Sequence, residues 1–129
     1  MLSEKQIEIT NKLLGNDMGR MAPNARDLEI AVLGAIMLEQ SAVNAVIDIL
    51  KADSFYDPRH NLIFSAILDL FSKGEPIDIL TVAQGMRKEG TLEAAGGPQY
   101  ISMLTNQVAS AANIEAHARV ISQKYIQRE

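Results

Sequence analysis

The residues of this chain that could carry chemistry are few and lie far apart. There are two histidines and no cysteines among 129 residues, which excludes a cysteine nucleophile, a disulfide framework and a thiolate metal site. His60 has only Asp57 as a local acidic neighbour, and we expect a surface histidine near a helix start rather than a general base. His117 lies beside Glu115 and Arg119, without the His-x-x-His or His-Glu-x-x-His spacing of a metal site. The histidines therefore predict neither acid–base catalysis nor metal binding.

Phosphate-binding and nucleic-acid-binding signals are equally weak. Neither Gly-x-x-x-x-Gly-Lys-Ser/Thr nor Gly-x-Gly-x-x-Gly occurs, and the isolated pair Gly96-Gly97 is best explained as a turn before a helix. The net charge of -4 and the pI of about 5.2 argue against a module that binds duplex DNA. A small helical enzyme would need a clustered acid–base pair. The sequence shows none, although contacts formed only in three dimensions could create one.

The composition predicts one folded, helical domain. Hydrophobic residues make up 47% of the chain and charged residues 22%, which excludes disorder for the body of the protein. Valine and threonine are scarce while alanine, leucine, isoleucine and glutamate are plentiful, which favours helices over strands. No stretch approaches the roughly 20 apolar residues that span a bilayer, and the first residues, Met1 to Lys5, lack the apolar run expected of a signal peptide. We therefore expect an all-α protein of a reducing cytoplasm with no membrane partner.

Capping and breaking signals divide the chain into an arm and about six helices. Residues 1–22 are predicted to be a flexible or weakly helical N-terminal arm and linker. The helices are predicted over residues 26–39 with Asn24 as the cap, 41–50 with Ser41 as the cap, 58–73 after Asp57, 79–89 between Asp78 and Gly90, 98–108, and 114 to the end. Because short loops make consecutive helices neighbours, residues 23–129 are predicted to form a compact helical bundle.

Three of these helices have informative faces. The helix over 26–39 is apolar on nearly all sides, which predicts the centre of the core. The inward stripes of the other two are Leu62, Ile63, Ala66, Ile67, Leu70 and Phe71 in one, and Ile114, Ala118, Ile121 and Tyr125 in the last helix. Val120 and Ile126 lie off that stripe, either as scattered surface residues or as a second apolar face for another chain. No Gly or Pro ends the last helix, so we expect a piece of a longer protein.

Ordered sequence blocks point to a known family. They are Ala31 to Ala35, Asp53 to His60, Leu62 to Phe64, Gly74 to Asp78 with Thr81 to Ala83, Gly96-Gly97, Tyr100-Ile101, and Ser110 to Glu115 with Ala118-Arg119. In this order and spacing they resemble the amino-terminal domain of the bacterial replicative DNA helicase of the DnaB type. The chain departs from the family pattern at Ala25, Ile30 and Pro98, which makes the transfer of partner contacts residue by residue unsafe.

This resemblance implies an all-helical collar domain that has no catalytic activity of its own. In that family the domain sits above the ring of ATPase domains in a hexamer, pairs with its neighbours with the help of a helical hairpin that follows it, and docks the helicase-binding domain of the primase. Parts of it can engage a helicase loader. The ATP-dependent helicase activity, ATP, magnesium and most DNA contact belong to a carboxy-terminal domain, so no cofactor is expected here. A helical module that guides single-stranded DNA is the alternative, opposed by the acidic balance and by an aromatic content of only 5%.

Candidate partner contacts follow from the predicted helices. They are Asp78, Thr81, Arg87 and Lys88 as one polar face, and Ile121, Tyr125 and Ile126 as residues that lead towards the hairpin. The competing interpretation for each is a helix cap, a solvated position or a core residue. Arg87 and Lys88, for example, lie in the last turn of their helix, where cations complement the helix dipole.

Overall fold

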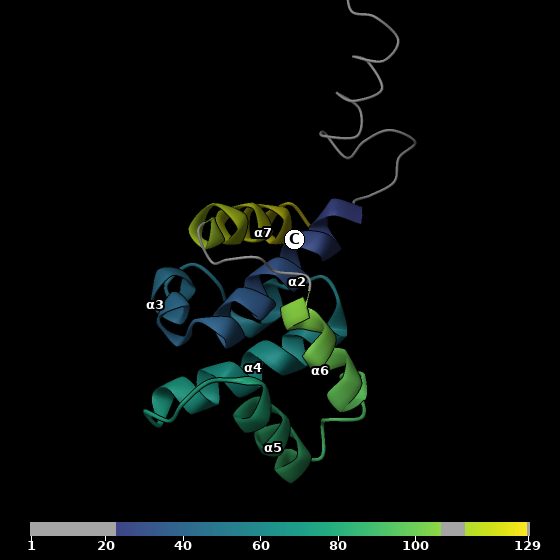
Figure 1. Cartoon of the computed structure of the whole chain (residues 1–129). Coiled ribbons are helices and arrows are strands. Elements are labelled where there is room, and N and C mark those ends of the chain that lie inside the picture. The colour runs from purple at the N-terminus through teal and green to yellow at the C-terminus, as the bar shows by residue number, and fades with distance from the viewer. Residues whose placement is uncertain (1–22, 107–112, 129) are drawn as a thin grey trace, which may run out of the picture.

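The computed structural model describes residues 23–106 and 113–128, which form six α-helices and no strand (Figure 1). The helices are α2 (Pro23–Leu38), α3 (Val43–Val46), α4 (Pro58–Ser72), α5 (Ile79–Glu89), α6 (Gly97–Asn106) and α7 (Ile114–Arg128), with 3-10 turns η2 (Gln40–Ala42) and η3 (Ala52–Ser54). The predicted all-α class is confirmed. The predicted arm over residues 1–22 lies outside the described residues, as does the break predicted over 108–112.

The central element is α2, as its apolar sequence predicts. It packs against α4, α6 and α7, and Val32, Leu33 and Ile36 have no exposed surface. The helix begins at Pro23, so the predicted cap Asn24 is wrong and lies inside the helix. A proline is well suited to a first helical turn, because the N–H that it lacks would have no partner there.

The boundaries of α4 and α5 follow local signals in the sequence. Asp57 caps α4 by accepting a hydrogen bond from the backbone N–H of Arg59 at 2.9 Å. Asp78 and Thr81 form a reciprocal capping box at the start of α5, with both side-chain-to-backbone distances at 2.9 Å. Gly90 ends α5 with a φ of 78°, a left-handed conformation that favours glycine. These three predictions are confirmed.

Two other predicted details are wrong. The second helical segment begins at Gln40 as a 3-10 turn, so Ser41 lies within it and is not its cap, and α3 ends at Val46. Phe71 is 38% exposed instead of pointing inward. The buried stripe of α4 ends at Leu70, and the residues from 71 to 76 are exposed.

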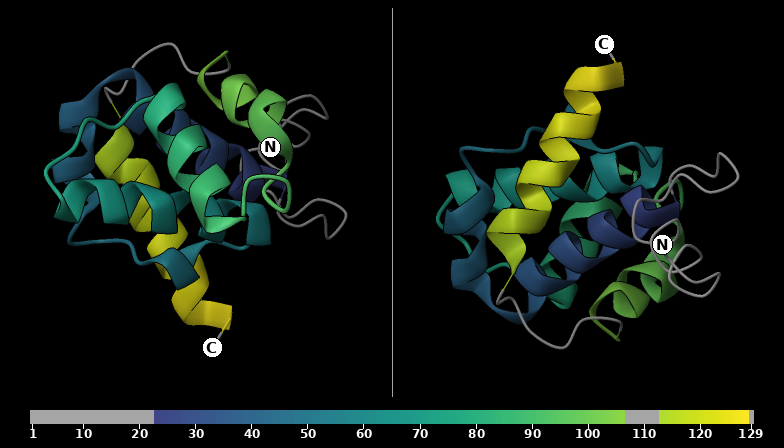
Figure 2. Two further views of the ribbon diagram at one scale, coloured as in Figure 1. Left: turned by 90° about the horizontal axis from the view of Figure 1, so that it is seen from below. Right: turned by 90° about the horizontal axis from the view of Figure 1, so that it is seen from above.

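The helices differ in how much of the body surrounds them. In both views of Figure 2 the carboxy-terminal end of α7 projects past the rest of the molecule, whereas α6 lies at the edge of the bundle. Within the described residues, every helix is too short or too polar to cross a membrane.

Candidate functional site

A cluster of polar side chains is buried where α2, α4 and α6 meet. We call Glu29, Asp57, Arg59, His60 and Tyr100 the polar cluster. Glu29 is 1% exposed and His60 is fully buried. The imidazole Nδ1 lies 2.6 Å from Glu29 Oε1, and its Nε2 lies 2.6 Å from the hydroxyl oxygen of Tyr100. The prediction of a surface histidine is therefore wrong, because α2 and α6 supply partners that cover the first turn of α4.

Glu29 is the acceptor at the centre of the polar cluster. Its carboxylate accepts hydrogen bonds from the backbone N–H groups of Tyr56 at 2.6 Å and Asp57 at 3.2 Å, besides facing His60. With the Glu29 carboxylate as the acceptor, Nδ1 of His60 is the donor, and Nε2 of His60 pairs with the hydroxyl group of Tyr100. The two side-chain hydrogen bonds of His60 thus join α2 to α4 and α4 to α6.

Charges around Asp57 stabilise its ionised form. Burial would raise the pKa of this carboxyl, but hydrogen bonds from the side chain and backbone of Arg59 outweigh burial and lower the pKa from 3.8 to about 2. The Arg59 Nη2 atom lies 2.8 Å from Asp57 Oδ2, and Arg26 Nε lies 3.6 Å from the same oxygen. The Arg59 guanidinium also lies 4.0 Å from the centre of the Tyr100 ring. Burial raises the pKa of Tyr100, and the charge of Arg59 opposes that rise.

The order carboxylate, imidazole, hydroxyl in Glu29, His60 and Tyr100 is the order of a catalytic triad. The surroundings do not favour that use. The raised pKa of Tyr100 disfavours ionisation of its hydroxyl group, and His60 is fully buried, so a substrate has no access to the imidazole. Neither of the two surface grooves, one between α4 and α5 and one beside Ile126, is lined by these residues. The arrangement fastens three helices together.

The polar cluster is not evident from the sequence because two of its members, Glu29 and Tyr100, are 31 and 40 residues from His60. One signal was available. Glu29 stands in a helix that is otherwise apolar on nearly all sides, and a buried carboxylate must find donors or a counter-charge.

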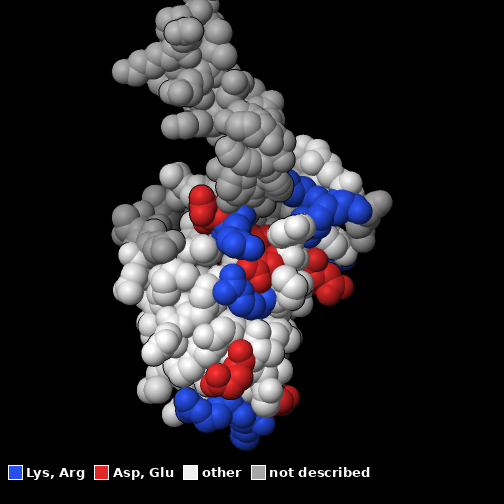
Figure 3. Space-filling view, turned by 90° about the vertical axis from the view of Figure 1, so that its right-hand side faces the viewer, with Lys and Arg blue, Asp and Glu red and all other residues white. Residues whose placement is uncertain are grey.

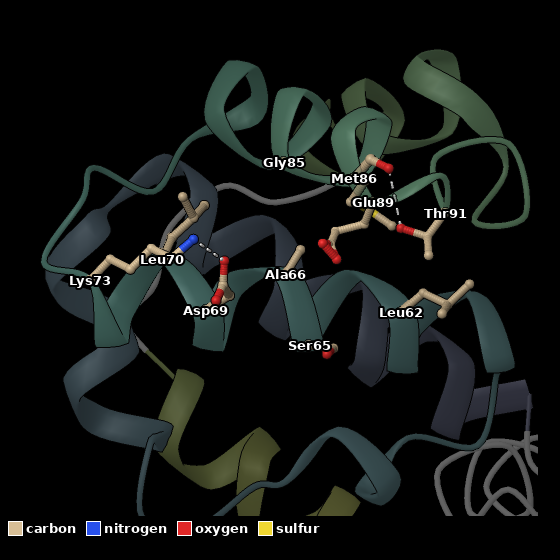
Figure 4. A pocket seen from close by; sticks show the side chains of 10 residues that line it. All are labelled: Leu62, Ser65, Ala66, Asp69, Leu70, Lys73, Gly85, Met86, Glu89 and Thr91. Carbon is tan, nitrogen blue, oxygen red and sulfur yellow. Dashed lines mark hydrogen bonds and ion pairs between the residues drawn. The ribbon is translucent and has the colours of Figure 1, made fainter.

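A groove open to solvent runs between the other end of α4 and α5. Two adjoining hollows share Asp69, Leu70, Lys73, Gly85 and Glu89, and together we call them the α4–α5 groove. The apolar side chains that line it are Leu62, Ala66, Leu70, Pro76 and Met86. Figure 4 shows the Glu89 side chain reaching from α5 into the space above α4. At the rim, Lys73 Nζ lies 3.0 Å from Asp69 Oδ2, with both side chains more than half exposed.

Gly85 lies in the interior of α5 and lines both hollows of the α4–α5 groove. A Cβ atom added there would meet nothing within 4 Å. A helix-interior glycine destabilises a protein by about 0.5–1 kcal/mol relative to alanine. Neither packing nor a left-handed conformation requires this glycine, so its effect is to keep the groove wide at that point.

Two of the predicted polar contact residues belong to this groove. Thr81 and Lys88 line it together, on the α5 side. Asp78 adjoins it as the partner of Thr81 in the capping box, and Arg87 is exposed in the last turn of α5. The structure therefore brings Thr81 and Lys88 to one surface and gives Asp78 a structural role of its own.

Comparison with known proteins identifies the family. A family model described as the DnaB-like helicase N terminal domain matches residues 21–123. This chain belongs to that family. The replicative DNA helicase DnaB of Rhodothermus marinus is 47% identical over 115 residues, which are 89% of this chain and 12% of that protein. The replicative DNA helicase DnaC of Bacillus subtilis (strain 168) is 39% identical over 109 residues, which are 84% of this chain and 24% of that protein. The chain thus spans about a quarter or less of such relatives.

Solved structures agree with this assignment. The crystal structure of the N-terminal domain of DnaB helicase from Mycobacterium tuberculosis matches with a TM-score of 0.75 and 37% identity, covering 78% of this chain and 73% of that one. A DnaB-like replicative helicase, described with its interactions with primase, matches with a TM-score of 0.69 and 29% identity, covering 78% of this chain and 23% of that one. The resemblance inferred from the ordered sequence blocks is confirmed.

The apolar candidates on α7 of this DnaB-like domain fall into different environments. Ile121 is 2% exposed and belongs to the core, Tyr125 is half-buried, and Ile126 is 65% exposed. Ile126 lines a shallow groove with Ile49 and four polar residues of α7, which are Arg119, Ser122, Gln123 and Gln127. Val120, the other residue off the inward stripe, is 37% exposed. Ile126 and Val120 are therefore available on the surface, and Ile121 is not.

Charges on the DnaB-like domain are mixed. Figure 3 shows acidic and basic side chains interspersed on one face, with an uncharged band between an upper and a lower group. At the end of α7, Arg128 Nη2 donates a hydrogen bond to the carbonyl oxygen of Ser54 at 3.1 Å. No group of three or more histidine, aspartate or glutamate side chains is placed to hold a metal ion in the part of the chain that the structure describes.

Proposed function

We propose that this chain is the non-catalytic collar domain of a replicative DNA helicase and that it assembles with other copies and docks a primase during DNA replication. The observation that carries the proposal is the likeness to a helicase whose structure is described with its interactions with primase. ATP and magnesium would act in another domain of the full-length helicase, and most contact with DNA would also lie there. The bacterial cytoplasm is the corresponding location.

The α4–α5 groove is the surface on this chain best suited to the primase. Its apolar lining offers area for burial, and its charged rim offers partners of both signs. The missing side chain at Gly85 lets a partner backbone approach α5 closely. We assign the contact to a helix of the helicase-binding domain of the primase that lies across Gly85 and meets Thr81 and Lys88 at the rim.

The non-catalytic part of the proposal rests on the polar cluster. Glu29 and His60 are the acid–base pair that an enzyme would need, but both are buried and hydrogen-bonded to neighbouring elements. A general base must reach the proton that it abstracts from a substrate. His60 is fully buried and offers no such approach.

Binding to the carboxy-terminal domain of the cognate primase, measured by isothermal titration calorimetry, tests the docking surface. Gly85→Gln places a flexible side chain in the groove without meeting any atom near its Cβ. We expect it to weaken binding at least about tenfold, because loss of a well-packed contact costs more than about 1.4 kcal/mol. Ala116→Gln, which adds the same side chain to an exposed position on α7, should bind like the unsubstituted chain.

Two results would contradict this assignment. The absence of a complex between the unsubstituted chain and the primase domain at high micromolar concentration would defeat docking by this chain alone. Equal binding by the Gly85→Gln and Ala116→Gln variants would remove the α4–α5 groove as the docking surface. A helicase loader can be titrated against the same three proteins.

Self-association is supported by an exposed apolar residue of α7. Ile126 lies off the buried stripe at 65% exposure, and a second copy would cover it. Sedimentation equilibrium of the unsubstituted chain should show a dimer or larger species that Ile126→Glu weakens. Concentration-independent monomers in both proteins would contradict pairing through this face of α7.

The alternative is a module that guides single-stranded DNA. The net charge of -4 and the mixed charges in Figure 3 do not favour it. Fluorescence anisotropy with a labelled oligonucleotide at low salt separates the two functions. Strong binding that falls steeply with salt would support the alternative, and no binding would remove it.

A further inference from the structure

Helix α6 lies at the edge of the bundle (Figure 2) and has two fully buried side chains. Its fully buried residues are Ile101 and Leu104, and it packs against α2 and α5 at the edge of the bundle (Figure 2). Its link to α4 is polar, because the Tyr100 hydroxyl lies 2.6 Å from His60 Nε2. Elements with few buried apolar contacts open at lower free energy than the whole fold.

The backbone at the start of α6 is unusual. Gly96 and Gly97 have φ values of 103° and 79°, so two consecutive residues are left-handed. A Cβ atom at Gly96 would lie 2.7 Å from Tyr100 Cβ, which is closer than real contacts allow. The glycine therefore does two things: it lets the chain reverse, and it leaves room for Tyr100 to approach His60.

We propose that α6 is a latched element, which opens as a unit about Gly96 and Gly97 and is held closed by the hydrogen bond between Tyr100 and His60. Opening exposes the inner face of α6, with Ile101 and Leu104, and the surfaces of α2 and α5 beneath it. This proposal concerns the fold of the chain and does not depend on primase docking.

The closed and open states differ in the hydrogen-bond partners that are available to His60. In the closed state His60 is fully buried, so Tyr100 is the partner that satisfies Nε2. In the open state water can reach both groups. Tyr100→Phe leaves Nε2 of His60 without a partner in the closed state and therefore destabilises that state. It destabilises the open state less, because water can then pair with Nε2. Opening of α6 becomes about tenfold more frequent.

Native-state amide hydrogen exchange of the whole chain, as a function of low urea concentrations, tests the latch. In the unsubstituted chain the α6 amides should exchange through an opening with a smaller urea dependence than the α4 amides, because less surface is exposed. Tyr100→Phe should accelerate exchange in α6 about tenfold. Tyr56→Phe, which keeps an exposed ring and loses only its hydroxyl group, should leave α6 unchanged.

A core variant separates the opening of α6 from global unfolding. Val46→Ala removes methyl groups from a fully buried position on α3, in packing that the open state retains. It should accelerate exchange in α4 and leave α6 unchanged. The latch is overturned if α6 and α4 share one urea dependence, if Val46→Ala accelerates both alike, or if Tyr100→Phe leaves α6 unchanged.

Discussion

The two ends of α4 use polar residues in opposite ways. At its start, Glu29, Asp57 and His60 are at most 4% exposed and are engaged with one another and with Arg59 and Tyr100. At its other end, Asp69 and Lys73 are 58% and 59% exposed and form a rim around an open groove. The start of α4, which has the residue types used in acid–base chemistry, is shielded from solvent. The other end, which has ordinary surface charges, borders an open groove.

This difference shows that residue type alone does not locate a functional surface. A buried carboxylate and a buried imidazole must each have a partner, because without one the desolvation of these groups destabilises the folded state. The burial of the pair also keeps these groups out of reach of another molecule. The open end has solvated charges that contribute little to stability, and it also has a glycine that the fold does not need. We therefore assign stability to the start of α4 and recognition to the α4–α5 groove.

Removal of the Glu29 carboxylate should have the largest effect on stability. In Glu29→Ala, three donors lose their acceptor in a buried site, and we expect a loss of about 3–5 kcal/mol in the free energy of unfolding, measured with urea. Asp27→Ala, at an exposed position of the same helix, should change it by less than about 0.5 kcal/mol. A similar small loss for both variants would mean that the polar cluster is not structural.

Acid should weaken the start of α4 through Asp57. Its pKa is lowered from 3.8 to about 2 in the folded chain, so its contribution is complete above pH 3.8 and is lost as the pH falls through about 2. That contribution is about 2 kcal/mol. The difference in unfolding free energy between the unsubstituted chain and Asp57→Asn should shrink by this amount between pH 5 and pH 2. A difference that stays constant over this range would show that Asp57 has an ordinary pKa.

A smaller effect distinguishes the two interpretations of Asp78, which caps α5 beside the groove. Asp78→Ala should lower the free energy of unfolding by about 1 kcal/mol, because the Thr81 N–H loses its acceptor. Asp78→Asn keeps a capping oxygen and removes the charge, so it should retain stability and primase binding. Binding that falls in Asp78→Asn while stability is unchanged would make Asp78 a partner contact as well.

The parts of the fold that the sequence predicts correctly depend on neighbours in the chain. The cap at Asp57, the cap at Asp78 and the stop at Gly90 involve residues within a few positions of one another. The central position of α2 is also predictable, because a helix without a polar face needs cover on all sides.

The errors and omissions come from contacts across the fold. His60 is buried by Glu29 and Tyr100, which are 31 and 40 residues away, and no periodicity within α4 shows them. Phe71 belongs to the apolar stripe by spacing, but the packing on α4 ends before it. Thr81 and Lys88 were selected from α5 alone. The groove that they line is formed between α5 and α4, so it depends on the packing of these two helices.

The most direct test of this division of roles is the free energy of unfolding of Gly85→Ala, measured with urea. We expect it to rise by about 0.5–1 kcal/mol, because alanine favours the helix and its Cβ meets nothing within 4 Å. A glycine that lowers stability and lines an open groove is then explained by recognition. A fall in the free energy of unfolding would show that the fold itself requires Gly85, and would contradict the assignment of recognition to the α4–α5 groove.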